Sequence, residues 1–236
     1  MPSVNRVLSV CSMASRSPLK PNAVILLSGG LDSATVLYWA YQNGYRPACL
    51  TVQYGQIHAR EIQNAKKIAR SLKLPHEICH VPMPWKGSAL LDRKIKMPRN
   101  RSFNAIGHGI PATYVPARNT ILLSLALGWA ETLKAKTIFI GAHQLDYSGY
   151  PDCRPEYFQA LQRAFNKGTK MGRFKIVAPL LKKDKAQIIR LAHRLGVPLQ
   201  WTWSCYSGGA QPCGTCDSCR LRQAGFEKAG LKDPVQ

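Results

Sequence analysis

The chain has 236 residues, enough for one domain with a small appendage and a sizeable hydrophobic core. Hydrophobic residues make up 45% of it, yet no apolar stretch approaches the roughly 18 residues of a membrane span, so we expect a cytoplasmic protein and no membrane contact. The formal net charge of +21 suits polyanionic partners such as nucleic acid, or reflects a generally basic proteome. The sequence leaves both interpretations open.

The first twenty residues are basic and rich in serine, contain no acidic residue and lack the apolar core of a secretory signal. We expect residues 1–21 to be a disordered extension. Residues 22–200 are predicted to form an α/β domain, and residues 201–236 a cysteine-rich tail packed on that domain.

An apolar run at residues 24–27 predicts a buried strand, and residues 31–41 predict a helix. Ser28, Gly29 and Gly30 lie between them, where two glycines permit positive φ and let a phosphate approach the backbone. The start of the helix adds free N–H donors and the positive end of its dipole. An ordinary turn is the alternative, but Asp32 and the serines add polar groups that a turn does not need. No Gly-Lys-Ser/Thr follows, so the pattern is not of the Walker type.

The remaining elements alternate between strands and helices. Strands are predicted at residues 47–53, 77–81, 137–140 and 174–178, and helices at 57–72, 117–133, 155–167 and 184–195. Residues 82–112 have little periodicity and predict a long functional or mobile loop. The alternation predicts a doubly wound parallel sheet, in which ligands bind beyond the carboxyl ends of the strands.

Polar side chains gather after several of these strands. Arg118 and Asn119 open a nearly apolar helix and are positioned to hold an anion or a polar ring, although Asn119 also suits a helix cap. Residues 141–154 form a dense polar loop that indicates a binding function. His143 in this loop is either a base or, as is commoner for a lone histidine, simply hydrogen-bonded.

The last predicted helix begins with an unusual pair. Asp184 is predicted to be its N-cap, and Lys185 places a cation in the first turn, where it opposes the helix dipole. A bound phosphate would relieve that conflict, and a solvated surface lysine is the alternative.

Four of the eight cysteines cluster near the end of the chain: three have C-x₂-C-x₂-C spacing, and the fourth lies eight residues before them. Four thiolates close a tetrahedral Zn²⁺ shell without an open position for water, which predicts one structural zinc ion per chain. An iron–sulfur cluster is the competing interpretation, but the residues between the cysteines suit a zinc knuckle and no proline follows the last of them. The predicted ligands are Cys205, Cys213, Cys216 and Cys219.

Together these motifs resemble the 7-cyano-7-deazaguanine synthases, the QueC family, within the ATP pyrophosphatases. The resemblance covers residues 22–228. It rests on Ser28-Gly-Gly-Leu-Asp-Ser33, Tyr54-Gly-Gln-x-His58 with Glu61, Val115-Pro-x-Arg-Asn119, Asp146-Tyr-Ser-Gly-Tyr-Pro-Asp-Cys-Arg154, Ser204-Cys-Tyr206 and the four cysteines. This chain has Ala117 where the family usually has glycine, and His143 where asparagine is common.

The resemblance implies an adenine nucleotide alpha hydrolase-like fold and an ATP-dependent ligase. The carboxylate of 7-carboxy-7-deazaguanine would be adenylated, ammonia would give the amide, and a second ATP would convert the amide to the nitrile. Asp32, with Mg²⁺, and Lys185 would act on the phosphates. ATP would contact Leu27, Ser28, Gly29, Gly30, Leu31, Asp32, Ser33, Ala34, Thr35, Val36 and Leu37, and the substrate Arg118, Asn119, Asp146, Tyr147, Asp152 and Arg154.

Three other functions remain open at this point. One is a tRNA-modifying adenylating enzyme of the thiolation or lysidine type, which the net charge of +21 favours. Another is a non-catalytic zinc module that binds nucleic acid, which the intact glycine motif disfavours. The third is a QueC-like enzyme that modifies a protein or a DNA base. The sequence also leaves a homodimer open.

Overall fold

The core of the computed structural model is a five-stranded sheet in which every neighbouring pair of strands is parallel, in the order β3-β2-β1-β4-β5. The structure describes residues 20–55, 60–106, 108–143 and 149–235. The predicted doubly wound sheet is confirmed, with strand ends within about a residue of those expected from the sequence. The strands are β1 Ala23–Leu26, β2 Pro47–Gln53, β3 His76–His80, β4 Thr137–Phe139 and β5 Lys175–Val177.

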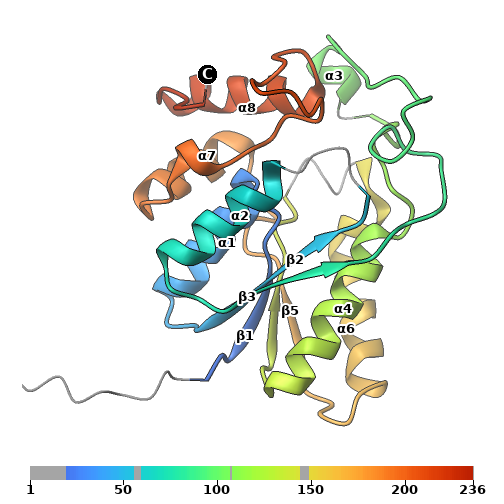
Figure 1. Cartoon of the computed structure of the whole chain (residues 1–236), viewed down its shortest axis with the longest axis vertical. Helices are drawn as coiled ribbons and strands as arrows, with labels where there is room; N and C mark the ends of the chain where they lie inside the picture. The colour runs from blue at the N-terminus through green and yellow to red at the C-terminus, as the bar shows by residue number, and fades with distance from the viewer. Residues whose placement is uncertain (1–19, 56–59, 107, 144–148, 236) are drawn as a thin grey trace, which may run out of the picture.

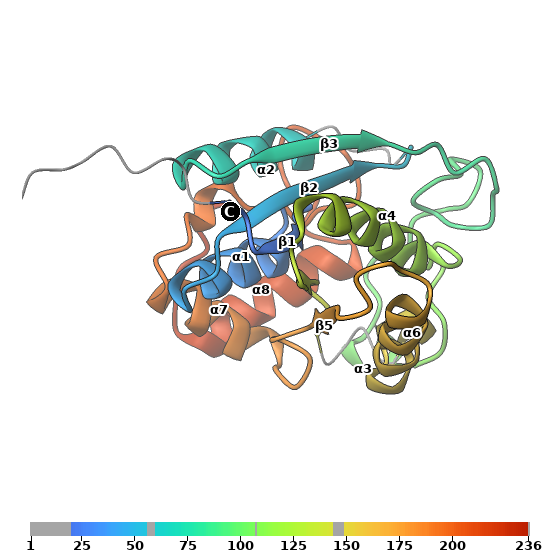
Figure 2. The same cartoon turned by 90° about the horizontal axis from the view of Figure 1, so that it is seen from below.

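Helices cover both faces of the sheet (Figures 1 and 2). Three of them, α1 (Leu31–Gln42), α2 (Arg60–Ser71) and α7 (Lys185–Arg194), bury apolar side chains against one face. The other face is covered by α4 (Arg118–Leu133) and α6 (Pro155–Lys167). Central strands buried on both faces explain why residues 24–27 read as a continuous apolar run.

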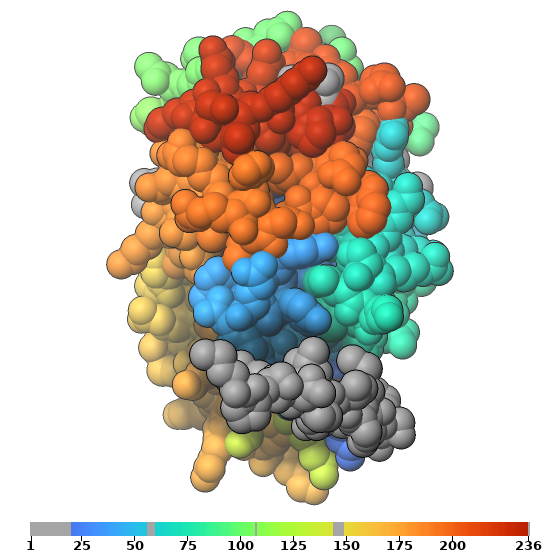
Figure 3. Space-filling model, turned by 90° about the vertical axis from the view of Figure 1, so that its left-hand side faces the viewer, coloured from blue at the N-terminus to red at the C-terminus, as the bar shows by residue number. Residues whose placement is uncertain are grey.

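The C-terminal segment adds a further helix, α8 (Asp217–Ala229), which lies over α7 (Figure 3). The two helices approach closely at Gly225, where a Cβ would lie 2.6 Å from Lys185 Cγ and 2.8 Å from Ile189 Cδ1. A buried ion pair holds the end of the chain, since Arg222 donates to Asp233 from Nε at 2.7 Å and from Nη2 at 2.9 Å. The tail is therefore packed against the α/β core.

The segment at residues 82–112 is largely irregular, as predicted, and contains one short helix, α3 (Phe103–Ile106). It is tied to the C-terminal segment. Arg99 and Cys216 form an antiparallel bridge, the Asn100 N–H donates to the Thr215 carbonyl at 2.9 Å, and Arg101 Nη1 donates to Asp217 Oδ2 at 2.9 Å. None of the helices in the described part of the chain has the length and apolar composition that a membrane span requires.

Candidate functional site

The glycine loop connects β1 to α1 at the point where the sheet changes direction. The chain leaves β1 towards β2 on one side, while β4 pairs with β1 on the other, and this arrangement opens a crevice at the strand ends. Gly29 has φ of 85°, and a Cβ there would overlap the Glu61 carbonyl oxygen, so glycine is required. Gly30 has φ of −80° and is the N-cap of α1, so the predicted positive φ holds at Gly29 alone.

Two serines fix the shape of this loop. The Gly30 N–H donates to Ser28 Oγ at 3.2 Å, and the hydroxyls of Ser28 and Ser33 lie 3.0 Å apart. Ser33 Oγ also donates to the Gly30 carbonyl at 3.1 Å and accepts from the Ser28 N–H at 3.2 Å. The loop is thus held open by its own side chains, which orients it before any anion binds.

Asp32, His143 and Lys185 meet beside the loop. Lys185 Nζ donates to both Asp32 oxygens, at 2.8 and 2.9 Å, and lies 3.0 Å from His143 Nε2. Burial alone would raise the pKa of Asp32, but Lys185 and His143 outweigh burial and hold that pKa below its usual value. The contact with Lys185 gives His143 a hydrogen-bonding partner that the sequence did not indicate, and both interpretations of this histidine stay open.

The backbone brings these three residues together in two ways. A Cβ at Gly141, directly after β4, would lie 3.0 Å from the Ser33 nitrogen, so the end of β4 is pressed against the start of α1. Asp184 is the N-cap of α7, as predicted, and its Oδ1 accepts from the Gln187 N–H at 2.7 Å. The cap starts α7 at Lys185, whose ammonium is neutralised by a carboxylate rather than left exposed.

A cavity of about 250 Å³ extends from the glycine loop across the ends of β1, β2 and β4. Arg118 lines its far side, and its Nη1 donates to the Tyr54 hydroxyl at 3.5 Å. Glu61 also lines this first cavity, and burial raises its pKa to about 7 despite the opposing charge of Arg118. The cavity therefore offers backbone donors at one end and a guanidinium at the other, a layout suited to a ligand with two acidic groups.

Asn119 lines this cavity and contacts Asp152, which does not. The Asp152 Oδ2 accepts from the Asn119 N–H at 2.9 Å, and the Asn119 side chain donates to the Asp152 carbonyl at 3.2 Å and to Cys153 Sγ at 3.0 Å. Asn119 is not the helix cap, because Ala117 occupies that position with φ of 55°. The other oxygen of Asp152 is buried without a hydrogen-bond partner among the described residues.

The other residues predicted to bind ligands are not gathered at the cavity. Residues 34–37 are buried inside α1, so the part of this predicted ATP stretch that lines the cavity ends at Ser33. Arg154 is exposed at the N-cap of α6 and lines neither cavity that the structure shows. Asp146, Tyr147 and His58 lie outside the described residues.

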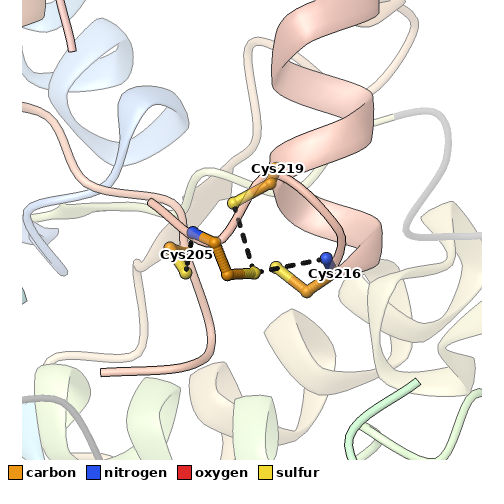
Figure 4. Close-up of side chains that lie close together, drawn as sticks. Cys205, Cys216 and Cys219 are labelled. Carbon is orange, nitrogen blue, oxygen red and sulfur yellow. Dashed lines mark hydrogen bonds between the residues drawn. The ribbon is translucent and has the colours of Figure 1, made fainter. Parts of the chain in front are cut away.

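The four cysteines lie close enough together to hold a metal ion. Their sulfur atoms all lie within 4.8 Å of one another, and Cys213 Sγ is 4.0 Å from Cys219 Sγ. Figure 4 shows three of them, Cys205, Cys216 and Cys219, with their side chains gathered together. Backbone N–H groups point at the sulfurs, from Ser207 and Cys213 to Cys205 and from Cys216 to Cys213. Such donors stabilise thiolates, the form that binds metal.

The metal-binding segment also forms a wall of the first cavity. Trp203, Ser204 and Tyr206 line it, and the Trp203 N–H donates to the Gly29 carbonyl at 3.0 Å. Arg60 stacks on the Trp203 ring, with its guanidinium carbon 4.4 Å from the ring centroid. The cysteine spacing predicts only a structural role for this segment. The motif Ser204-Cys-Tyr206 is the sequence signal that the segment also borders the first cavity.

A doubly wound sheet with a glycine loop at its switch point defines a nucleotide-binding α/β protein. The family model "Queuosine biosynthesis protein QueC" matches residues 22–230, so the chain belongs to the QueC family. It is 51% identical over 219 residues to the 7-cyano-7-deazaguanine synthase of Trichodesmium erythraeum, covering 90% of this chain and 99% of that protein. The enzyme of the same name from Thermoplasma acidophilum is 48% identical over 220 residues, covering 92% of each chain.

A solved structure shares the fold at low identity. NMN synthetase from Francisella tularensis superposes with a TM-score of 0.51 at 14% identity, covering 90% of this chain and 79% of that one. The likeness supports the predicted fold class.

Proposed function

We propose that this chain is an ATP-dependent ligase that converts 7-carboxy-7-deazaguanine and ammonia to 7-cyano-7-deazaguanine, a precursor for queuosine. The proposal follows from membership of the QueC family and from one observation. A single cavity connects the glycine loop, with Asp32, to Arg118. This arrangement can hold the phosphates of ATP and an acidic heterocycle in contact.

In the first half-reaction, the substrate carboxylate attacks the α-phosphate of ATP and pyrophosphate leaves. Backbone N–H groups from Ser28 to Ser33 stabilise the charge on the leaving group, and Lys185 lies beside them to do the same. Ammonia then displaces AMP from the acyl carbon. A second ATP activates the amide oxygen, and loss of AMP leaves the nitrile.

Arg118 and Asn119 are the residues to which we assign the deazaguanine substrate. Arg118 keeps its positive charge in a half-buried position, where a carboxylate or ring carbonyl would complete its hydrogen bonds. Asp152 lines neither cavity, and it supports this assignment by accepting a hydrogen bond from the Asn119 N–H. Asp146, Tyr147 and Arg154 remain assigned to the substrate only through the family motif.

Two metal ions belong to this proposal. The four sulfurs suit Zn²⁺, because tetrahedral Zn–S bonds of about 2.3 Å place sulfurs about 3.8 Å apart, close to the separation seen. In a [4Fe–4S] cluster each thiolate binds a different iron, and in a [2Fe–2S] cluster the four thiolates are divided between two irons, so in both cases some of the sulfurs lie further apart. Asp32 is the carboxylate that would hold Mg²⁺ beside the loop, together with phosphates and water. Bound there, Mg²⁺ would neutralise charge on the leaving pyrophosphate.

The test is incubation of the protein with ATP, Mg²⁺, ammonium and 7-carboxy-7-deazaguanine, followed by assay of AMP and the mass of the nitrile. Asp32→Asn should abolish turnover with the fold intact by circular dichroism, and normal turnover would refute the role of Asp32. Cys216→Ser should release zinc and lower the melting temperature. AMP formation that requires tRNA in place of the deazaguanine would favour a tRNA-modifying enzyme, the alternative that the net charge of +21 favours.

A further inference from the structure

Two opposite charges line the first cavity without pairing with each other. Glu61 and Arg118 both border this space, and the charge of Arg118 acts on Glu61, where it opposes the effect of burial on the pKa of the carboxyl group. The two side chains nevertheless form no ion pair, since the salt bridges in the described part of the chain join other residues. Opposite charges held apart in one cavity leave room between them for a ligand that carries both an acceptor and a donor.

The Glu61 carboxylate is open to such a ligand. Its side chain makes no hydrogen bond or ion pair with the described residues, and the side-chain oxygens there that lack both a partner and accessible surface belong to Asp152, Ser207 and Asp217. The Glu61 oxygens therefore keep surface that faces the cavity. The other carboxylate among the described residues of the wall, Asp32, is already bonded to Lys185 through both oxygens. A buried carboxylate is costly unless donors reach it, so we expect a ligand to supply them.

The fold fixes the places of the two charged residues from opposite faces of the sheet. Glu61 lies in the first turn of α2, and its carbonyl oxygen packs so closely on the glycine loop that a Cβ at Gly29 would lie 2.1 Å from it. Arg118 is the first residue of α4, which covers the other face (Figure 2). Because the sheet separates these helices, the two charged groups reach the cavity from opposite sides.

The ring of the proposed substrate carries a matching row of groups. Along one edge of a 7-deazaguanine, a ring carbonyl accepts hydrogen bonds, and the neighbouring ring N–H and exocyclic amino group donate them. A carboxylate accepts from two adjacent donors with its two coplanar oxygens, and a guanidinium donates to a carbonyl. The adenine of ATP offers only one donor group on the same edge, beside a ring nitrogen that accepts. The two charges therefore fit the deazaguanine better than they fit adenine.

We propose that Glu61 reads this edge of the substrate: its carboxylate accepts from the ring N–H and from the amino group, while Arg118 donates to the ring carbonyl. The inference rests on the proposed function and adds the residue that selects the ring. When the amino group is missing, one oxygen of Glu61 is left without a donor. Because an unpaired buried acceptor is costly, Glu61 makes the enzyme discriminate against rings that lack this group.

The experiment compares two substrates in two proteins. 7-Carboxy-7-deazaguanine and its analogue without the exocyclic amino group are assayed for AMP release with wild type and with Glu61→Gln, at saturating ATP and ammonium. The assays run at about pH 8, where Glu61 is ionised, since burial raises its pKa to about 7.

We expect wild type to prefer the amino-bearing substrate in kcat/KM by about tenfold or more, the fold-change of a lost hydrogen bond to a charged group. Glu61→Gln should lose most of this preference, because the NH₂ group of the new side chain opposes one of the two donors of the ring. Its KM for ATP should stay within about twofold of wild type, because the adenine does not contact this residue.

Two further variants isolate the effect. Glu77→Gln makes the same charge change at an exposed position of β3 and should keep the wild-type preference. Glu61→Asp keeps a carboxylate and should retain more of the preference than Glu61→Gln does, although its shorter side chain binds both substrates less tightly. Zinc content and circular dichroism are measured for each protein, because the charge of Cys205 also acts on Glu61.

A wild-type protein that uses both substrates equally would overturn the inference, whatever the variants do, and so would a Glu61→Gln protein with the wild-type preference. A raised KM for ATP together with an unchanged preference would assign Glu61 to the adenine and would overturn it as well. The proposed function is tested separately: it fails if wild type releases no AMP with 7-carboxy-7-deazaguanine and ammonium. If wild type releases AMP but shows no preference, only the role of Glu61 fails.

Discussion

Replacement of Gly225 by alanine tests whether α8 positions Lys185. The new Cβ would lie 2.6 Å from Lys185 Cγ and 2.8 Å from Ile189 Cδ1, so α7 and α8 must separate or both side chains must shift. Overpacking of this kind costs about 1–3 kcal/mol, while alanine in a helix gains about 1 kcal/mol over glycine. We therefore expect a net loss of up to about 2 kcal/mol of unfolding free energy and a fall in activity of about 100-fold, since a displacement of about 1 Å can cost that much.

The assay combines urea unfolding with the rate of AMP release. Gly128→Ala is the matched control, because Gly128 is also helical and a Cβ there meets nothing within 4 Å; it should gain about 1 kcal/mol and keep full activity. Ile189→Val combined with Gly225→Ala removes the contact with Ile189 Cδ1 alone, so activity should stay low because the new Cβ still displaces Lys185. A Gly225→Ala protein as stable and active as the Gly128→Ala control would refute the reasoning.

Three other predictions concern single side chains. Ala117→Gly should raise the unfolding free energy by about 1 kcal/mol, because φ of 55° strains alanine by more than glycine costs in the unfolded chain, and a lower value in urea melts would contradict this. Because burial raises the pKa of Glu61 from 4.5 to about 7, the folded state keeps this proton longer than the unfolded state does, and stability falls as pH rises through that window. Glu61→Gln should remove up to about 3 kcal/mol of the fall in stability between pH 4.5 and about 7. Urea melts of this variant below and above that interval that show the same fall as wild type would contradict the prediction. Asp233→Asn leaves the buried Arg222 charge without its anion and should cost about 3–5 kcal/mol by urea unfolding; a loss below about 1 kcal/mol would show that the pair is dispensable.

The features that the sequence predicted correctly depend on residues close together in the chain. The strand before Ser28 and the helix after it follow from an apolar run broken by two glycines. Asp184 could be predicted as an N-cap from its own position, and the cysteine spacing indicated a metal site before any distance was known. Each of these depends on backbone propensities and hydrogen bonds that act over a few residues.

The features that the sequence did not reveal depend on contacts between distant residues. Asp32 and Lys185 are separated by 153 positions, and only the packing of α7 against α1 brings them into contact. The polar loop around His143 was recognised as functional, but its periodicity could not show that His143 contacts Lys185. The position of Trp203 in the cavity wall could not be predicted either, because its N–H donates to the carbonyl of Gly29, which is distant in the sequence.

The contacts of the C-terminal segment have a consequence for the timing of activity during protein synthesis. Chains fold from the N-terminus as they emerge from the ribosome, so the glycine loop is made first. Trp203, which closes on Gly29, and Gly225, which packs against Lys185, are made last. A growing or truncated chain therefore has the phosphate loop without the Trp203 wall of the cavity and without the α8 contact that holds Lys185.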